Sequence, residues 1–375
     1  MSTAGIIFSS LNNDTLTRLT SDRTVAAIPF ACRYRIVDFG LSNMVNANIS
    51  NISIVANYNY RSLVEHVGSG KDWDLARRAG GINFISPYQS SHSSSAKLYS
   101  TRLEALRNMQ EHIAEFKEDN VVLMRCDAIL NFDLQDVIRQ HDKSGAAITF
   151  VTKRITPDFS AKIKRLMFST VAGKITDIAM SNTYLSKNPE LSLDILVMKT
   201  EYLRTIIREA EGYNYKSLTE MLFRSLRSRD YRTYLYDGYV ASISSFLDYY
   251  RASMDMVNNC AARESLLNKQ FAPIYTKVHN SAPVIYKAGS HVENSMIADE
   301  CVIEGTVINS VLFRGVKVEK GAVVKNSVLF YGTHVGSGAR VNCVVADKNV
   351  YIGDGTAVLS GNENIPFYIQ KGRRI

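Results

Sequence analysis

Asp127 is the acidic side chain best placed for chemistry, because it follows a buried apolar run at residues 121–124. A carboxylate at the end of a strand can hold Mg²⁺ on a nucleotide phosphate, since Mg²⁺ commonly takes one or two carboxylates together with phosphate oxygens. The same carboxylate can instead accept hydrogen bonds from the turn that follows the strand. Both interpretations remain open from the sequence.

The elements that would position Asp127 form an alternating pattern of strands and helices. A helix is predicted over residues 101–116, where apolar residues recur on one face. Apolar runs of strand length lie at residues 4–10, 52–56, 121–125 and 148–152. This pattern predicts a Rossmann-like α/β domain with a mostly parallel sheet covered on both faces. Ligands bind beyond the carboxyl ends of such strands, so the crevice is expected at the loops after residues 10, 56 and 126.

A serine-rich segment at residues 90–95 reads SSHSSS and is typical of a flexible surface loop. It is either a loop over the crevice or an insertion without function.

Three segments near the C-terminus repeat at a fixed spacing. They begin at Val318, Val335 and Ile352, which are 17 residues apart (335 − 318 = 17 and 352 − 335 = 17). A second series of tetrapeptides, each beginning with Asn, is interleaved with the first at residues 294–297, 309–312, 326–329 and 342–345. Aliphatic residues recur six positions apart within these segments, with Gly or small residues between them. Such six-residue steps predict a left-handed parallel β-helix, in which three steps make one coil of about 18 residues.

Two histidines of the repeat region, His291 and His334, are candidates for acyl transfer, because a histidine at a coil corner can act as a general base. The simpler interpretation is that both are solvated surface residues. Exposed coil faces are expected to serve subunit contacts.

The bulk properties of the 375-residue chain narrow the function classes. Its net charge is +8, but the Lys and Arg residues are dispersed, which favours a solvated basic surface or phosphate-bearing small molecules over nucleic acid. The five cysteines are widely spaced and predict neither a disulfide framework nor a zinc site. No apolar run is long enough to span a membrane, and residues 4–8 do not read as a signal peptide. A cytoplasmic protein is expected.

Residues 33–43 read RYRIVDFGLSN and resemble the pattern K/R-F/Y-R-I/L-I/V-D-F-x-L-S-N of bacterial glucose-1-phosphate adenylyltransferases, also called ADP-glucose pyrophosphorylases. A weaker likeness lies at residues 248–255, where DYYRASMD is similar to the family's A-Y-W-x-A-N-M-D. With the β-helix, the resemblance covers nearly the whole chain. The family makes ADP-glucose from ATP and glucose 1-phosphate, which commits carbon to glycogen.

The chain departs from this family at the phosphate-binding loop. The family's loop, G-G-x-G-T-R-L, surrounds the triphosphate with backbone N–H groups. Here residues 10–16 read SLNNDTL, so the glycines and the arginine are absent, and Asp14 would repel phosphate. In the family's next motif, R-A-K-P-A, Arg23 is retained as a catalytic residue while Val25 replaces the lysine.

The metal-binding positions also differ. The family's G-D-H reads CDA here and retains the metal-binding Asp127, whereas the second metal-binding aspartate corresponds to Ser242. The sugar-phosphate lysine falls near Ser181. Mg²⁺ is the cofactor that the family implies, but these losses remove most of the electrostatic stabilisation that phosphoryl transfer requires. Arg23 and Asp127 are therefore predicted to be vestigial catalytic residues, and the pattern disfavours Mg²⁺ binding by this chain.

Arg33 matches a basic position that the family uses for phosphorylated activators, and Arg35 lies beside it. The resemblance implies that these two residues bind phosphorylated metabolite effectors. Alternatively, both form structural ion pairs near Asp38.

The set of departures is similar to the GlgD-type regulatory subunit of Firmicute bacteria, a poorly active or inactive paralogue that assembles with an active GlgC-type subunit and raises its activity. The resemblance thus implies a regulatory, non-catalytic subunit of ADP-glucose pyrophosphorylase in glycogen biosynthesis, within a heterotetramer that contains the catalytic GlgC-type paralogue. The alternative is an active glucose-1-phosphate adenylyltransferase with an altered ATP loop. The expected domains are a nucleotidyltransferase-like α/β domain at residues 1–250, a linker at 251–285 and a left-handed β-helix at 286–375.

Overall fold

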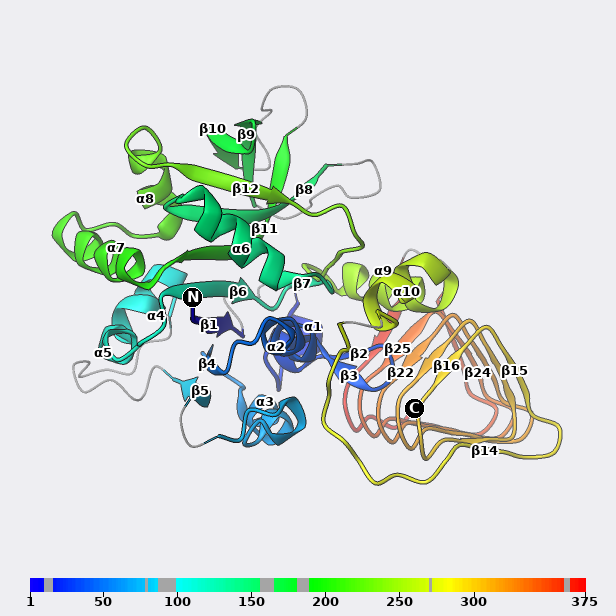
Figure 1. Ribbon diagram of the computed structural model, residues 1–375. Helices are drawn as coiled ribbons and strands as arrows, with labels where there is room; N and C mark the ends of the chain where they lie inside the picture. The colour runs from blue at the N-terminus through cyan, green and yellow to red at the C-terminus, as the bar shows by residue number, and fades with distance from the viewer. Residues whose placement is uncertain are drawn as a thin grey trace.

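A computed structural model of the protein describes residues 1–9, 16–77, 80–86, 99–155, 165–180, 189–269, 272–360 and 365–375. It contains an α/β domain and a β-helix, with two helices between them (Figure 1). Residues 10–15, the segment 90–95 and Ser181 lie outside the described residues, so the predictions made for them are not addressed by the structure. Among the described residues, no helix is both long and apolar enough to cross a membrane.

The α/β domain is built on a nine-stranded sheet in the order β5-β4-β1-β6-β11-β8-β12-β10-β9. Its strands are β1 (Thr3–Phe8), β4 (Asn51–Val55), β5 (Gly81–Ile85), β6 (Asn120–Arg125), β8 (Ile148–Arg154), β9 (Leu166–Val171), β10 (Lys174–Met180), β11 (Glu190–Lys199) and β12 (Tyr231–Leu235). Strands β5, β4, β1 and β6 pair in parallel. Strand β11 runs antiparallel to both of its neighbours, β6 and β8, so the second half of the sheet is mixed.

Helices cover both faces of this sheet, as predicted. Alternate residues of β1 point to opposite sides, so Ile7 joins one buried cluster while Ile6 and Phe8 join the other. The helices and short 3-10 turns are α1 (Thr17–Thr20), η1 (Val25–Ala27), α2 (Ile36–Asn46), α3 (Arg61–Val67), η2 (Lys71–Trp73), α4 (Arg102–Asn108), α5 (Gln110–Ala114), α6 (Leu134–Ser144), α7 (Thr200–Gly212), α8 (Leu218–Ser225), α9 (Phe246–Asn258) and α10 (Cys260–Leu267). Two small sheets pair β2 (Pro29–Phe30) with β3 (Tyr34–Arg35), and β7 (Ala128–Ile129) with β13 (Ala241–Ser242).

The single helix predicted over residues 101–116 is two helices in the structure. Thr101 caps α4 by accepting a hydrogen bond from the Glu104 N–H. Met109, whose side chain is buried, has φ −101° and ψ 20°, and this conformation separates α4 from α5. The spacing of apolar residues continues through Met109, so the periodicity of the sequence did not reveal the break between the two helices.

The C-terminal repeat forms three parallel sheets of five strands each, consistent with a left-handed β-helix (Figure 1). The first comprises β14 (Ile285–Tyr286), β17 (Val302–Ile303), β20 (Lys317–Val318), β23 (His334–Val335) and β26 (Tyr351–Ile352). The second comprises β15 (His291–Glu293), β18 (Thr306–Ile308), β21 (Val323–Lys325), β24 (Arg340–Asn342) and β27 (Ala357–Leu359). The third comprises β16 (Met296–Ile297), β19 (Val311–Leu312), β22 (Val328–Leu329), β25 (Val344–Ala346) and β28 (Phe367–Ile369). The predicted register is confirmed, because Val318 pairs with Val335 and Val335 with Ile352.

The interleaved asparagines form a ladder at one corner of the coils. Asn294, Asn309 and Asn326 adopt φ between +40° and +46°, a region that asparagine tolerates better than most residues. The Nδ2 of Asn294 donates to Asn309 Oδ1 at 2.7 Å, and the Nδ2 of Asn326 donates to Asn342 Oδ1 at 3.0 Å. The repeated asparagine thus supplies both the turn conformation and a hydrogen bond between coils.

Helix α9 joins the two domains. Its Tyr249 ring packs edge-on against Phe330 of the β-helix, with 6.1 Å between ring centroids. The hydroxyl of Tyr249 donates to the Pro29 carbonyl, and that of Tyr250 donates to the Asn326 carbonyl. The domain boundary predicted at residue 250 falls inside this helix, and the first strand of the β-helix begins at Ile285.

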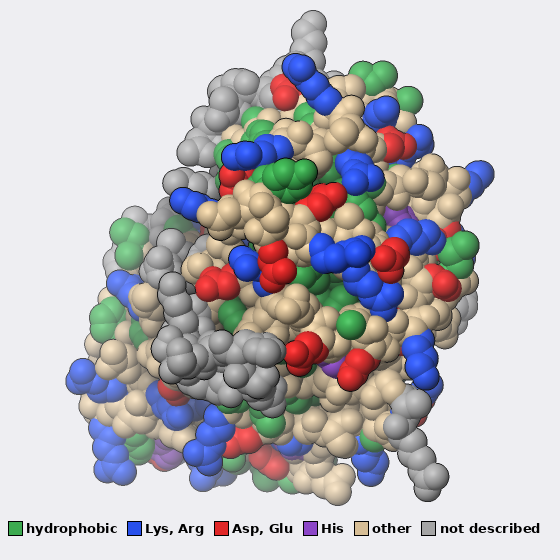
Figure 2. Space-filling view, turned by 90° about the vertical axis from the view of Figure 1, so that its left-hand side faces the viewer, with side chains coloured by type: hydrophobic (Ala, Val, Ile, Leu, Met, Phe, Trp, Pro, Cys, Tyr) green, Lys and Arg blue, Asp and Glu red, His purple; other side chains and the backbone are tan. Residues whose placement is uncertain are grey.

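Charges of both signs are mixed on the face shown in Figure 2, where Lys and Arg side chains are interspersed with Asp and Glu. This mixture on the face shown is consistent with the prediction that the basic residues form a solvated surface.

Candidate functional site

Asp127 lies where the sequence predicts, at the carboxyl edge of the parallel strands. Strands β1, β4 and β6 end side by side, because the Ser9 N–H donates to the Val55 carbonyl and the Cys126 N–H to the Phe8 carbonyl. Asp127 follows β6 directly, and its carbonyl accepts a 2.7 Å hydrogen bond from the Ile243 N–H. The β7–β13 pair sets Ala128 opposite Ser242, so Asp127 and Ser242, the two positions that the resemblance assigns to metal, are neighbours.

The Asp127 carboxylate is engaged by two arginines. Its Oδ2 lies 2.8 Å from Arg125 Nη2 and 3.1 Å from Arg165 Nη2. The same Nη2 of Arg165 donates to Ser242 Oγ at 3.2 Å. Arg165 is 1% exposed at its side chain, so this guanidinium is a buried bridge between Asp127 and Ser242.

A second carboxylate completes the arrangement. Asp194 lies in β11 where the strand register shifts, and its φ is +57°. It accepts hydrogen bonds from Arg102 Nη2 at 3.0 Å and from Arg125 Nη1 at 3.2 Å. Burial alone would raise the pKa of Asp194, but Arg102, Arg125 and Arg165 together lower it to about 2. We call these three arginines with Asp127 and Asp194 the arginine–aspartate cluster.

The cluster does not fit a divalent cation. It holds three positive charges against two negative ones, and at an effective dielectric constant of 20 two unit charges 4 Å apart interact by about 4 kcal/mol. A metal ion beside Asp127 would therefore be repelled by the guanidinium groups. The other carboxylate oxygen, Asp127 Oδ1, is buried and has no hydrogen-bond partner among the described residues, but one oxygen is far from the full oxygen shell of Mg²⁺. In the described part of the chain, no group of three or more His, Cys, Asp or Glu side chains is arranged to hold a metal.

Arg23 lies in the domain junction. Its Nη2 donates to Asp347 Oδ1 of the β-helix at 2.8 Å, and the residue is 1% exposed. The hydroxyl of Tyr368 donates to the other oxygen of Asp347 at 2.6 Å. This buried ion pair gives Arg23 a structural role that requires no substrate. Its catalytic role stays a prediction. Val25, at the position of the family's lysine, is buried in η1.

Arg33 and Arg35 line a cavity of about 340 Å³ between the α/β domain and the β-helix. Its lining residues come from both domains and from the segment that connects them: Pro29, Cys32, Arg33, Tyr34, Arg35, His66, His279, Glu300, Phe313, Arg314, Tyr331 and Lys348. Four of these side chains are cationic and one is acidic. We call this cavity the junction pocket.

Burial and neighbouring positive charges disfavour the charged forms of two cations of the junction pocket, Arg35 and Lys348. Burial, with the charges of Arg23 and Arg314 contributing, lowers the pKa of Arg35 to about 10. Burial and the charges of Arg35 and Arg23 lower the pKa of Lys348 to about 8. An anion in the pocket would relieve this repulsion, so the chemistry of the pocket suits a phosphate or another multiply charged anion.

The Asp38 carboxylate is hydrogen-bonded to groups other than the guanidiniums of Arg33 and Arg35. Its Oδ1 lies 2.6 Å from His66 Nε2, and its Oδ2 accepts hydrogen bonds from the Thr276 hydroxyl and the Arg35 backbone N–H. In the described residues no ion pair joins Asp38 to the guanidinium of Arg33 or Arg35. The guanidinium of Arg35 instead donates to Ser62 Oγ at 2.8 Å. These contacts do not support the interpretation that Arg33 and Arg35 form structural ion pairs near Asp38, and the effector role stays a prediction.

The two histidines have acidic neighbours on the coil surface. His334 Nε2 lies 2.7 Å from Glu319 Oε1, and its ring stacks on Tyr351. His291 Nε2 lies 3.6 Å from Glu293 Oε2. These contacts account for both histidines as surface residues, and acyl transfer stays a prediction.

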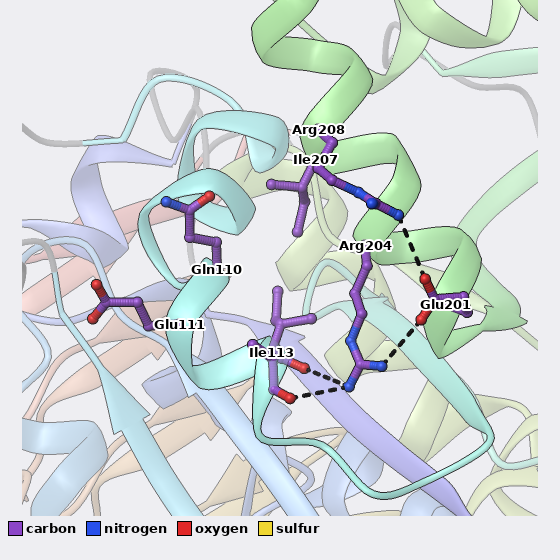
Figure 3. Close-up of a pocket in the computed structure, with 8 residues that line it drawn as sticks. Gln110, Glu111, Ile113, Glu201, Arg204, Ile207 and Arg208 are labelled. Carbon is purple, nitrogen blue, oxygen red and sulfur yellow. Dashed lines mark hydrogen bonds and ion pairs between the residues drawn. The ribbon is translucent and has the colours of Figure 1, made fainter.

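A second hollow, of about 390 Å³, lies between α5 and α7, and none of the predicted site residues lines it (Figure 3). Arg204 donates to the carbonyls of Ile113, Ala114 and Phe116 at the end of α5, and its Nη1 pairs with Glu201. The two terminal nitrogens of Arg204 thus have partners within the chain, as expected for a cation that caps a helix C-terminus.

Sequence reasoning missed Arg102, Arg125, Arg165 and Asp194. Asp194 carried a signal, because it is a charged residue inside the apolar run of β11. Arg165 carried none, since its partners lie 38 and 77 residues away.

Comparisons with known proteins agree with both halves of the architecture. Residues 5–161 match the family described as nucleotidyl transferase, and residues 281–364 match the GlmU-like, C-terminal hexapeptide family. The chain is 32% identical over 324 residues to the glycogen biosynthesis protein GlgD of Bacillus subtilis (strain 168), covering 86% of this chain and 82% of the relative. It is 33% identical over 325 residues to the GlgD of Geobacillus stearothermophilus, covering 85% and 82%. It is 28% identical over 316 residues to the glucose-1-phosphate adenylyltransferase of the same organism, covering 83% and 80%.

Proposed function

The chain belongs to the family of bacterial GlgD proteins and glucose-1-phosphate adenylyltransferases, and on that premise we propose that it is the regulatory, non-catalytic subunit of an ADP-glucose pyrophosphorylase in glycogen biosynthesis. It enhances a catalytic GlgC-type paralogue that makes ADP-glucose and pyrophosphate from ATP and glucose 1-phosphate. The two chains assemble as a heterotetramer.

The observation that carries this proposal is the state of the two metal positions. Asp127 is retained, but Ser242 pairs with the adjacent Ala128, and Arg165 bonds both Asp127 and Ser242. Nucleotidyl transfer depends on cations that neutralise the charge developing on the phosphates. A crevice whose sole remaining metal carboxylate is already neutralised by arginines is poorly suited to that task.

The junction pocket supports the regulatory part of the proposal. It contacts both domains and concentrates cations away from the crevice, so a phosphorylated effector bound there would bridge the α/β domain and the β-helix. Coupling of this kind needs two distinct sites and a shared structural element between them. Asp347 offers such a shared element, because it pairs with Arg23 and directly precedes Lys348 of the junction pocket.

The second candidate function is that of an active adenylyltransferase with a rearranged ATP loop. It is favoured by the retention of Asp127 at the carboxyl edge of the sheet and by its unpaired oxygen Oδ1. The two candidates differ in what the purified chain does alone.

The test is an assay of ADP-glucose synthesis by the purified chain, by the catalytic paralogue, and by the two co-purified, each with Mg²⁺ and both substrates. We expect no synthesis above background by the chain alone and more activity from the complex than from the paralogue. Turnover by the chain alone that disappears in Asp127→Asn would overturn the proposal and support the second candidate.

A further inference from the structure

We propose that the guanidinium of Arg165 is the built-in counter-cation of Asp127, and that this crevice therefore binds no divalent cation. The inference rests on the proposed function and deepens it, since it supplies a physical reason for an inactive crevice. The inference can nevertheless be wrong while the proposed function is right.

The position of Arg165 is fixed from two sides. One nitrogen, Nη2, contacts Asp127 Oδ2 and Ser242 Oγ at 3.1 and 3.2 Å. The other, Nη1, donates to the Ser192 carbonyl at 3.4 Å and lies 4.0 Å from Asp194 Oδ2. A planar guanidinium that is held at both ends and almost fully buried cannot turn away into solvent to admit another cation.

The rest of the cluster holds this arrangement in place. Arg125 bonds both carboxylates, reaching Asp127 with Nη2 and Asp194 with Nη1. Asp194 keeps a left-handed backbone conformation at a strand irregularity, which costs of order 1–3 kcal/mol and persists only where the surroundings enforce it. Arg102, Arg125 and Arg165 surround its carboxylate and provide that enforcement.

Ser242 alone does not explain the loss of a metal site. If the serine were the whole reason, restoring a carboxylate at this position would restore the site. With Arg165 in place, however, a carboxylate at position 242 would gain the ion pair that the Ser242 hydroxyl now approximates. The two explanations therefore predict opposite results for Ser242→Asp.

The experiment is a titration of Mn²⁺ with the full-length chain, without nucleotide, in which electron paramagnetic resonance measures the free ion. Mn²⁺ is a suitable probe because it prefers the same oxygen ligands as Mg²⁺. The chain is compared with Ser242→Asp, with Arg165→Gln and with the double variant. Arg61→Gln, which removes an exposed arginine paired with Glu65, is the matched control.

We expect the unaltered chain, Ser242→Asp and the control to leave Mn²⁺ free. We expect the double variant to bind it at least about tenfold more tightly than Ser242→Asp, a difference of about 1.4 kcal/mol. Mn²⁺ binding by the unaltered chain that is lost in Asp127→Asn would overturn the proposal. So would binding by Ser242→Asp that equals that of the double variant.

Two features keep the outcome decisive. If the Arg165 variants do not fold, which circular dichroism would show, the unaltered chain and Ser242→Asp still decide between the two explanations. The titration needs neither substrate nor partner, so it is separate from the assay of the proposed function. An inactive chain that binds Mn²⁺ would refute this inference and leave the proposed function standing.

Discussion

At the scale of single residues, the side chains that the family resemblance identifies have different surroundings. Asp127 is neutralised by arginines in the crevice, while Arg23 is taken up by an ion pair with the β-helix. Arg33 and Arg35 line a cavity that has an excess of positive charge. The two positions that the resemblance assigns to catalysis thus have partners within the chain, whereas the two that it assigns to effectors line the junction pocket.

Lys348 makes the junction pocket sensitive to pH. Its pKa is lowered to about 8 by burial and by Arg35 and Arg23, so the empty pocket loses one positive charge as the pH rises through 8. An anion prefers the charged form, and its affinity must fall over that range. We expect sulfate, whose own charge is constant there, to bind about tenfold more weakly at pH 9 than at pH 7, by calorimetric titration.

Lys348→Arg is the matched variant, because it keeps the charge over the whole pH range. It should bind sulfate with nearly equal affinity at pH 7 and pH 9. An unaltered chain with no pH dependence, or a variant with the same dependence, would contradict the assignment of the titrating group to Lys348.

At the scale of elements, the regular parts of the chain were predictable and the irregular parts were not. The 17-residue spacing predicted the register of the β-helix because each coil repeats the same local structure, an inward-facing aliphatic side chain followed by a tight turn. The parallel strands β1, β4 and β6 were visible as short apolar runs. The antiparallel half of the sheet and the break at Met109 depend on packing between distant segments, which leaves no periodic signal.

The same distinction explains the site. Asp127 was identified because it ends a strand, and Ser242 because a motif placed it. The arginines of the arginine–aspartate cluster come from β6, from the start of α4 and from the segment before β9. Their convergence is a product of the tertiary fold, and no spacing in the sequence encodes it.

The asparagine ladder is the element-scale feature whose energetics can be tested. Asn326→Ala removes the side-chain hydrogen bonds to Asn309 and Asn342, each worth about 0.5–1.5 kcal/mol. It also puts alanine in a left-handed conformation that asparagine tolerates better, at a cost of about 1–2 kcal/mol at most. Asn326→Gly removes the same hydrogen bonds but adopts this backbone conformation without strain. In urea unfolding we expect Asn326→Ala to be clearly less stable than Asn326→Gly, and equal stabilities would show that the backbone conformation is unimportant.

At the scale of the whole molecule, one of the hydrophobic clusters extends across both domains. The buried cluster that contains Ile7 and the α2 side chains continues through Tyr249 into Val328 and Phe330 of the β-helix. Helix α9 and the stretch at residues 33–43 both lie at this junction. The segments that most resemble the family are thus those that join the domains and line the junction pocket.

A shared core predicts that the domains unfold together. In differential scanning calorimetry we expect a single transition, with calorimetric and van't Hoff enthalpies in agreement. Arg23→Ala leaves Asp347 buried without its partner and should lower the free energy of unfolding by about 3–5 kcal/mol.

Arg61→Ala provides the comparison for that variant. It removes an arginine from an exposed pair and should cost at most about 1 kcal/mol. Two separate transitions in the unaltered chain would show that the domains are independent. Equal stability of the two variants would show that the Arg23–Asp347 pair does not hold the junction together.

The bridge from Asp127 through Arg165 to Ser242 also has a consequence for the mutational paths open to the chain. An aspartate introduced at position 242 would pair with Arg165, and a loss of Arg165 alone would remove a partner from two buried carboxylates. If the crevice binds no metal, as we propose, neither single mutation would create a metal site. Both changes would be needed in the same chain, so no single substitution along that path would be favoured by selection for metal binding.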